Sequence, residues 1–151
     1  MQSTYNENAA SRPLGADADS LLQSSSTAPA TILIVEDETL VSFFIRTLLE
    51  DRGLKVAVAA TAAEALQLIE ALGTNLGAAI IDVGLPDTPG DQLVAPIRSK
   101  LPQLPIVIAT GFSETEFGRR FQADERVRVI GKPFDAPLLW SALADLDDQF
   151  A

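Results

Sequence analysis

Apolar residues along this chain fall into short continuous runs that alternate with stretches of helical periodicity. Residues 31–35 form one such run, as expected for a strand whose two faces are both buried. Four similar runs follow at regular intervals along the chain. The five predicted strands cover residues 31–35, 54–58, 77–81, 105–109 and 127–130.

Between these runs, apolar residues recur every three or four positions, which is typical of amphipathic helices. Thr61 and Glu64 form a capping box at one helix start, and Asp135 is a capping residue at another. Gly53 and Gly73 are helix stops. Helical spacing covers apolar positions 40–49, 66–72 and 139–146, and further helices are predicted over about 90–100 and 113–121.

Two of the predicted helices contain residues that disfavour a regular helix. Pro96 lies inside the 90–100 helix, so we expect a kink there or an unsatisfied carbonyl near Gln92. Gly118 lies in the middle of the 113–121 helix and predicts that this helix is weak.

Five strand–helix units in alternation predict a parallel sheet with helices on both faces. Right-handed crossovers leave few possible topologies. The sequence therefore predicts an α/β domain with a flavodoxin-like, doubly wound (βα)5 fold and strand order 2-1-3-4-5.

The chain divides by composition into two parts. Residues 1–30 are rich in Ser, Ala, Asn, Gln and Thr, which predicts a disordered N-terminal tail. Leu21-Leu22 could form a short docking patch within it, but a simple tail is the better interpretation. Residues 31–151 are expected to form a single domain, a length sufficient to bury a core.

The composition excludes several classes of chemistry. There are no cysteines and no histidines, which rules out thiol nucleophiles, Ser-His catalysis, Cys- or His-based metal sites and a phosphohistidine on this chain. The net charge of −10 disfavours nucleic acid and anionic membranes as partners. No apolar run reaches the length of a membrane helix, and the N-terminus does not resemble a secretory signal. A cysteine-free chain also fits the reducing cytoplasm.

Polar residues that can carry chemistry follow four of the five strands. Glu36 and Asp37 follow the first strand, Asp82 the third, Thr110 the fourth and Lys132 the fifth. In doubly wound sheets, ligands bind outside the carboxyl ends of the strands, so all five side chains are expected to face one crevice.

Three converging carboxylates repel one another, and a hard divalent cation such as Mg²⁺ relieves that repulsion. Asp82 would then be a nucleophile that forms an aspartyl phosphate. The metal and the Lys132 ammonium would neutralise the transferring phosphoryl group, and the Thr110 hydroxyl would donate to one of its oxygens.

Four short motifs in the chain resemble those of the receiver (response-regulator) domain family of two-component signalling. They lie in order and at suitable spacing, and the resemblance covers about residues 31–148. The motifs are Ile34–Glu38, Ile81–Pro86, Ala109–Gly111 and Gly131–Phe134.

The resemblance implies a role for each matching residue. Asp82 aligns with the phosphorylated aspartate, and Glu36 and Asp37 align with the acidic pair that binds Mg²⁺, with Asp37 the more direct ligand. The backbone carbonyl of Gly84 aligns with a further metal ligand.

The remaining motif residues align with groups that contact the phosphoryl group. These are Thr110 and Lys132, and the Lys132–Pro133 bond resembles one that is cis in the family. The resemblance implies a phosphohistidine on a histidine kinase or a phosphotransfer protein as the phosphoryl donor.

One position departs from the family pattern. Receivers carry Tyr or Phe three residues before the lysine, where this chain has Val129. A subgroup of alphaproteobacterial receivers, nicknamed FAT GUY, also lacks that aromatic and is similar to this chain over Ile108–Phe112. We expect the signal to travel instead through residues 111–122, which phosphorylation would order.

The sequence leaves rival interpretations to be tested. Each site residue taken alone has an ordinary structural explanation, such as a turn or a solvated side chain. A receiver-fold binding module that regulates a kinase without phosphotransfer is the main alternative. An aspartate phosphatase needs a second acid where Gly84 stands, and a flavin or nucleotide site needs a Gly-rich loop after the first strand.

The favoured interpretation is a single-domain response regulator that accepts a phosphoryl group on Asp82. It would catalyse its own phosphotransfer and dephosphorylation but would not be a conventional enzyme. We expect a cytoplasmic protein, a monomer or weak homodimer, that signals by protein–protein contact.

Overall fold

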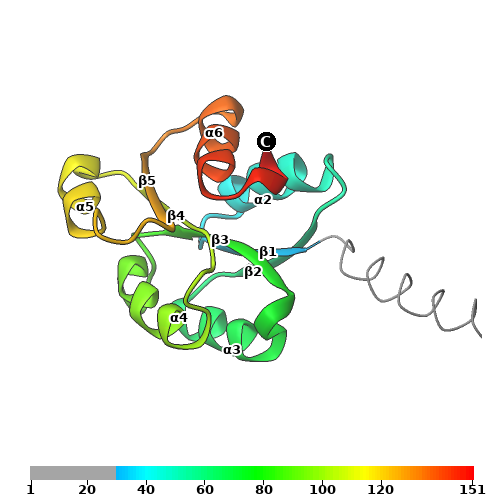
Figure 1. The fold of residues 1–151 in the computed structure, drawn as a ribbon, viewed down its shortest axis with the longest axis horizontal. Helices are drawn as coiled ribbons and strands as arrows, with labels where there is room; N and C mark the ends of the chain where they lie inside the picture. Colours follow the sequence, from blue (N-terminus) through cyan, green and yellow to red (C-terminus); the bar gives the residue numbers. More distant parts are fainter. Residues whose placement is uncertain (1–29) are drawn as a thin grey trace, which may run out of the picture.

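The computed structural model describes residues 30–151, so the predicted tail of residues 1–30 lies, except for Ala30, outside the described residues. Five strands form one parallel sheet in the order β2-β1-β3-β4-β5 (Figure 1). This confirms the predicted fold and strand order. The strands are β1 (Thr31–Val35), β2 (Lys55–Ala59), β3 (Leu76–Asp82), β4 (Ile106–Thr110) and β5 (Val127–Gly131).

Helices cover both faces of the sheet. Figure 1 shows α2 and α6 on one side of the sheet and α3 and α4 on the other, with α5 beside β5. The α-helices are α2 (Thr39–Glu50), α3 (Ala62–Leu72), α4 (Val94–Lys100), α5 (Glu114–Arg120) and α6 (Ala136–Leu146). Three short 3₁₀ helices are η1 (Gly73–Asn75), η2 (Gly90–Leu93) and η3 (Asp148–Phe150).

The core is divided by the sheet into two apolar layers, because successive side chains of a strand point to opposite faces. In β1, Leu33 and Val35 lie in the layer under α3 and α4. Ile32 and Ile34 lie in the layer under α2 and α6. All four are fully buried, as a central parallel strand requires.

The helix caps predicted from the sequence form in the structure. Thr61 Oγ1 accepts a hydrogen bond from Glu64 N at 3.0 Å, and Asp135 Oδ1 accepts one from Leu138 N at 3.0 Å. Gly73 has a φ of 49° at the end of α3, a conformation that favours glycine.

The expectation of one helix over residues 90–100 is wrong. The segment divides into η2 and α4, and the chain changes from 3₁₀ to α geometry at Leu93. Pro96 therefore falls in the first turn of α4, where a missing N–H interrupts no regular α-helical ladder. The second and fourth strands also each lie one residue later than predicted.

Within residues 30–151, no helix is both long and apolar enough to cross a membrane.

Candidate functional site

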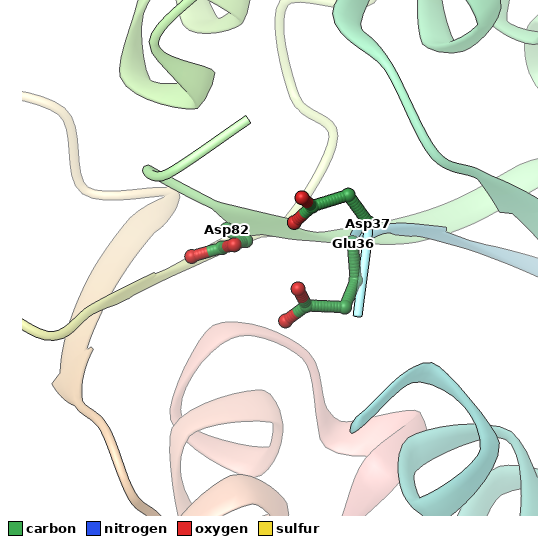
Figure 2. A group of neighbouring side chains, drawn as sticks. All are labelled: Glu36, Asp37 and Asp82. Atoms are coloured by element: carbon green, nitrogen blue, oxygen red, sulfur yellow. The ribbon is translucent and has the colours of Figure 1, made fainter. Parts of the chain in front are cut away.

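Three carboxylates meet at the carboxyl edge of the sheet. Glu36 and Asp37 follow β1, and Asp82 is the last residue of β3, the strand beside it. One oxygen of each carboxylate lies within 4.8 Å of the others. Figure 2 shows the side chains of Glu36 and Asp37 extending toward the side on which Asp82 lies. The sheet thus brings together the acidic residues that the sequence placed at its edge.

The three acids differ in burial. Asp82 and Glu36 are only 6% and 4% exposed, whereas Asp37 is exposed at the mouth of the cluster. The carboxylate of Asp82 accepts a hydrogen bond from Gly84 N at 3.2 Å, and that of Glu36 accepts one from Glu38 N at 3.1 Å. These backbone bonds fix the buried carboxylates where their oxygens face the cluster.

Lys132 supplies the positive charge of the cluster. Its Nζ lies 3.1 Å from Glu36 Oε1, 3.3 Å from Asp82 Oδ1 and 3.6 Å from Glu38 Oε1. The residue follows β5, and the Lys132–Pro133 bond is cis, as the sequence resemblance implied. One ammonium therefore bridges the ends of β1, β3 and β5.

This concentration of charge shifts two pKa values. Burial raises the pKa of Glu36 to about 7, and the charge of Asp82 adds to the shift, while the Glu38 amide and Lys132 oppose it. Burial alone would lower the pKa of Lys132. The hydrogen bond to Glu36 and the charges of Asp82 and Glu36 outweigh burial and raise it. The lysine therefore remains charged.

Thr110 ends β4 and is fully buried. Its hydroxyl oxygen accepts a hydrogen bond from Phe112 N at 3.0 Å, and its carbonyl accepts one from Lys132 N at 2.8 Å. The β3–β4 register pairs Asp82 with Ala109, which places Thr110 one residue beyond the aspartate along the same edge.

Gly84 lies two residues after Asp82 in the loop beside the cluster. A Cβ at Gly84 would lie 3.7 Å from Asp82 Oδ2. Whether its carbonyl faces a metal stays a prediction.

Sequence reasoning missed one contact that shapes this site. Asp87 accepts hydrogen bonds from Ala62 N at 2.9 Å and Ala63 N at 3.0 Å. These bonds lower the pKa of Asp87 and fasten the loop after β3 to the start of α3. A carboxylate that caps a helix 25 residues away leaves no local sequence signal.

The cluster is chemically suited to a hard cation. It offers only carboxylate oxygens, with a lysine on one side and an exposed acid at the mouth, and hard divalent cations prefer oxygen ligands. A doubly wound parallel sheet with such an acidic cluster and a lysine at its carboxyl edge defines the receiver class of α/β proteins.

Comparisons with known proteins agree with this class. The family model for the response regulator receiver domain matches residues 32–144. The chain therefore belongs to the receiver domain family of two-component systems.

Two curated relatives are much longer proteins that match this chain over a part of their length. The chain is 32% identical over 117 residues to the sensor kinase CckA of Brucella abortus, a match that covers 78% of this chain and 12% of CckA. It is 37% identical over 79 residues to the two-component response regulator PhoP of Pseudomonas aeruginosa, with 52% and 34% covered. The chain thus spans only a minor part of these relatives.

Solved structures show the same fold. A CheY-like response regulator receiver domain protein from Methanospirillum hungatei is 31% identical with a TM-score of 0.68, covering 80% of this chain and 96% of that chain. The chemotaxis protein CheY4 of Vibrio cholerae is 26% identical with a TM-score of 0.70, covering 79% and 99%.

Proposed function

We propose that this chain is a phosphoacceptor whose Asp82 carboxylate receives a phosphoryl group. The observation that carries the proposal is the Asp82 carboxylate itself, which lies 3.3 Å from the Lys132 ammonium and beside Glu36 and Asp37. An oxygen of Asp82 would bond to phosphorus while the P–N bond of a donor phosphohistidine breaks, leaving its electron pair on the imidazole nitrogen.

Mg²⁺ is the cofactor that fits the donor set. Asp37, Asp82, Glu36 and the carbonyl of Gly84 would hold it, with Asp37 as the exposed ligand. When bound, Mg²⁺ would neutralise negative charge on the transferring phosphoryl group.

Two further side chains would act directly on the phosphoryl group. Lys132 is held between Glu36 and Asp82, so its ammonium is already placed where phosphoryl oxygens would arrive. The Thr110 oxygen is occupied by the Phe112 amide, which leaves the hydroxyl proton to donate to a phosphoryl oxygen.

The rim of the site favours a protein as the phosphoryl donor. A groove of about 400 Å³ lies beside Lys132, where Leu40 is 84% exposed and Phe44 40% exposed. Exposed apolar surface of this kind suits a protein partner rather than a small anion. We propose a histidine kinase or a phosphotransfer protein. The groove is lined by Leu40, Val41, Phe44, Lys132, Pro133 and Phe134.

The wider interpretation follows from the same proposal. The chain would act as a single-domain, cytoplasmic response regulator, a monomer or weak homodimer, that signals by protein contact. Its net charge of −10 supports protein partners over nucleic acid or membranes. Self-catalysed phosphotransfer and hydrolysis at Asp82 would be its only chemistry. Membership of the FAT GUY subgroup stays a prediction.

The decisive experiment is labelling by acetyl phosphate, followed by intact mass. The chain should gain one phosphoryl group in the presence of Mg²⁺, and Asp82→Asn should abolish the gain. Asp51→Asn is the matched control, because it removes an exposed carboxylate at the end of α2, outside the cluster. A folded wild-type chain that stays unlabelled would favour the binding-module alternative.

A second experiment tests the donor surface. Phe44→Ala should slow transfer from a phosphorylated histidine protein while leaving acetyl phosphate labelling unchanged, because Phe44 lies on the rim and outside the acidic cluster. Equal slowing of both reactions would count against a role in partner contact.

A further inference from the structure

A second buried carboxylate lies away from the acidic cluster. Asp91, in η2, is only 6% exposed, and its Oδ2 lies 2.7 Å from Arg120 Nη2 at the end of α5. A buried carboxylate without a partner is costly, so Arg120 compensates the charge. The guanidinium carbon also lies 5.2 Å and 5.3 Å from the ring centres of Phe117 and Phe121. The Arg120 guanidinium is therefore contacted by the Asp91 carboxylate and by two aromatic rings.

The Asp91 end of this ion pair is fixed to the phosphoacceptor strand. Gly90 N donates a hydrogen bond to Val83 O at 2.9 Å. A Cβ at Gly90 would lie only 1.9 Å from the carbonyl oxygen of Asp82, so the two backbone segments are in direct contact. Asp91 therefore follows Gly90, whose backbone packs against that of Asp82, the proposed phosphoacceptor.

The Arg120 end belongs to the most weakly held helix of the domain. Of the five α-helices among residues 30–151, only α5 has no fully buried residue, and it contains Gly118. Its start is capped by Ser113, whose Oγ accepts from Glu116 N at 3.1 Å. Ser113 follows Phe112, whose amide donates to the Thr110 hydroxyl. A movement of α5 would therefore be transmitted to Thr110 through Ser113 and Phe112.

Arg120–Asp91 is the only ion pair that joins α5 to another element in the described part of the chain. We propose that this pair positions α5, and through it the Thr110 hydroxyl, relative to Asp82. Arg120 and Asp91 are then positioning residues for the phosphoryl group, although neither belongs to the acidic cluster. This inference rests on the proposed phosphoacceptor function.

The test uses beryllofluoride with Mg²⁺ as a phosphoryl mimic, measured by calorimetry at a temperature where every variant is folded. Arg120→Met should weaken beryllofluoride binding about threefold to tenfold and speed amide exchange over residues 111–122. Arg119→Met is the matched control, because Arg119 is exposed on the same helix and forms no ion pair with residues 30–151. It should leave both measurements unchanged.

A double-mutant cycle separates positioning from simple loss of stability. Asp91→Asn/Arg120→Met removes both charges and leaves no unpaired buried carboxylate, so it should fold even if Arg120→Met does not. Its binding defect should match that of either single variant rather than their sum. A variant that only loses stability would show a lower melting temperature with an unchanged dissociation constant.

The outcomes are distinct. Wild-type affinity and exchange in both Arg120→Met and the double variant would overturn the inference and leave the phosphoacceptor function standing. A wild-type chain that neither binds beryllofluoride nor becomes labelled would overturn both.

Discussion

Glu36 carries the clearest pH dependence in this domain. It is 4% exposed, and burial together with the charge of Asp82 raises its pKa from 4.5 to about 7. Between these two values the folded chain holds a proton on Glu36 that the unfolded chain has released. The chain contains no histidine, so no histidine titrates in the same window.

The sign of the effect follows from proton linkage. Where the folded state binds more protons than the unfolded state, the free energy of unfolding falls as the pH rises. The shift of the Glu36 pKa sets an upper limit of about 3 kcal/mol on the loss of unfolding free energy, at about 1.4 kcal/mol per pKa unit. Between pH 5.5 and pH 8, a pKa of about 7 gives a loss of about 2 kcal/mol. We therefore expect the metal-free chain to be less stable at pH 8 than at pH 5.5.

The other groups with shifted pKa values affect stability only outside the range from pH 5.5 to pH 8. Asp87 and Asp124 have lowered pKa values, because backbone amides bind Asp87 and the Arg98 guanidinium outweighs the burial of Asp124. Their contributions are lost only as the pH falls below the ordinary range of an aspartate. The raised pKa of Lys132 matters only in alkaline solution.

Urea unfolding at pH 5.5 and pH 8 in the presence of EDTA measures this effect. The wild-type chain should lose about 2 kcal/mol, whereas Glu36→Gln should remove most of that loss. Asp37→Asn is the control, because it removes a neighbouring acid that is exposed, and it should keep the wild-type slope. A Glu36→Gln variant with the wild-type slope would refute the assignment of this pH dependence to Glu36.

Four further substitutions test the packing and the helices around the site. Gly90→Ala should destabilise the fold by about 2–3 kcal/mol in urea unfolding, because the new Cβ would clash with the Asp82 backbone. Gly131→Ala should cost under about 1 kcal/mol, because its Cβ would meet only the movable end of the Glu114 side chain. Asp135→Ala removes the cap of α6 and should cost about 1 kcal/mol in the same assay. Gly118→Ala has open space for its Cβ and should slow amide exchange in α5 about fivefold, so an unchanged rate would show that glycine does not limit this helix.

The central strands of the fold could be predicted closely because their sequence pattern is simple. Ile32–Val35 and Ile106–Ala109 are buried on both faces, so every position must be apolar. The starts of β2, β3 and β4 were each predicted only to within one residue, because an apolar run does not mark the exact end of a strand. Strand alternation and crossover handedness then determined the sheet order, which placed the ends of four strands at one edge.

The details that the sequence could not predict all depend on contacts between distant segments. Asp91 follows a glycine in a polar stretch, and nothing local indicates that its carboxylate is buried against a helix 29 residues later. The contact of Glu38 with Lys132 likewise requires β1 and β5 to be placed first. Sequence reasoning predicted which residues share the edge, whereas burial and pairing decide how each one is held.

The contacts around α5 suggest how a receiver without an aromatic at Val129 can respond to its site. The segment after β4 is held at both ends, by the hydrogen bond from the Phe112 amide to Thr110 and by the ion pair between Arg120 and Asp91. A movement of the Thr110 hydroxyl toward a phosphoryl group cannot shift the whole segment while the Arg120 pair holds. The change must be absorbed between these two ties, where Gly111 and Gly118 have open space for a Cβ and so are not required by packing. We expect these two glycines to let residues 111–120 reorder, and removal of the Arg120–Asp91 ion pair should spread the same change over the whole of α5.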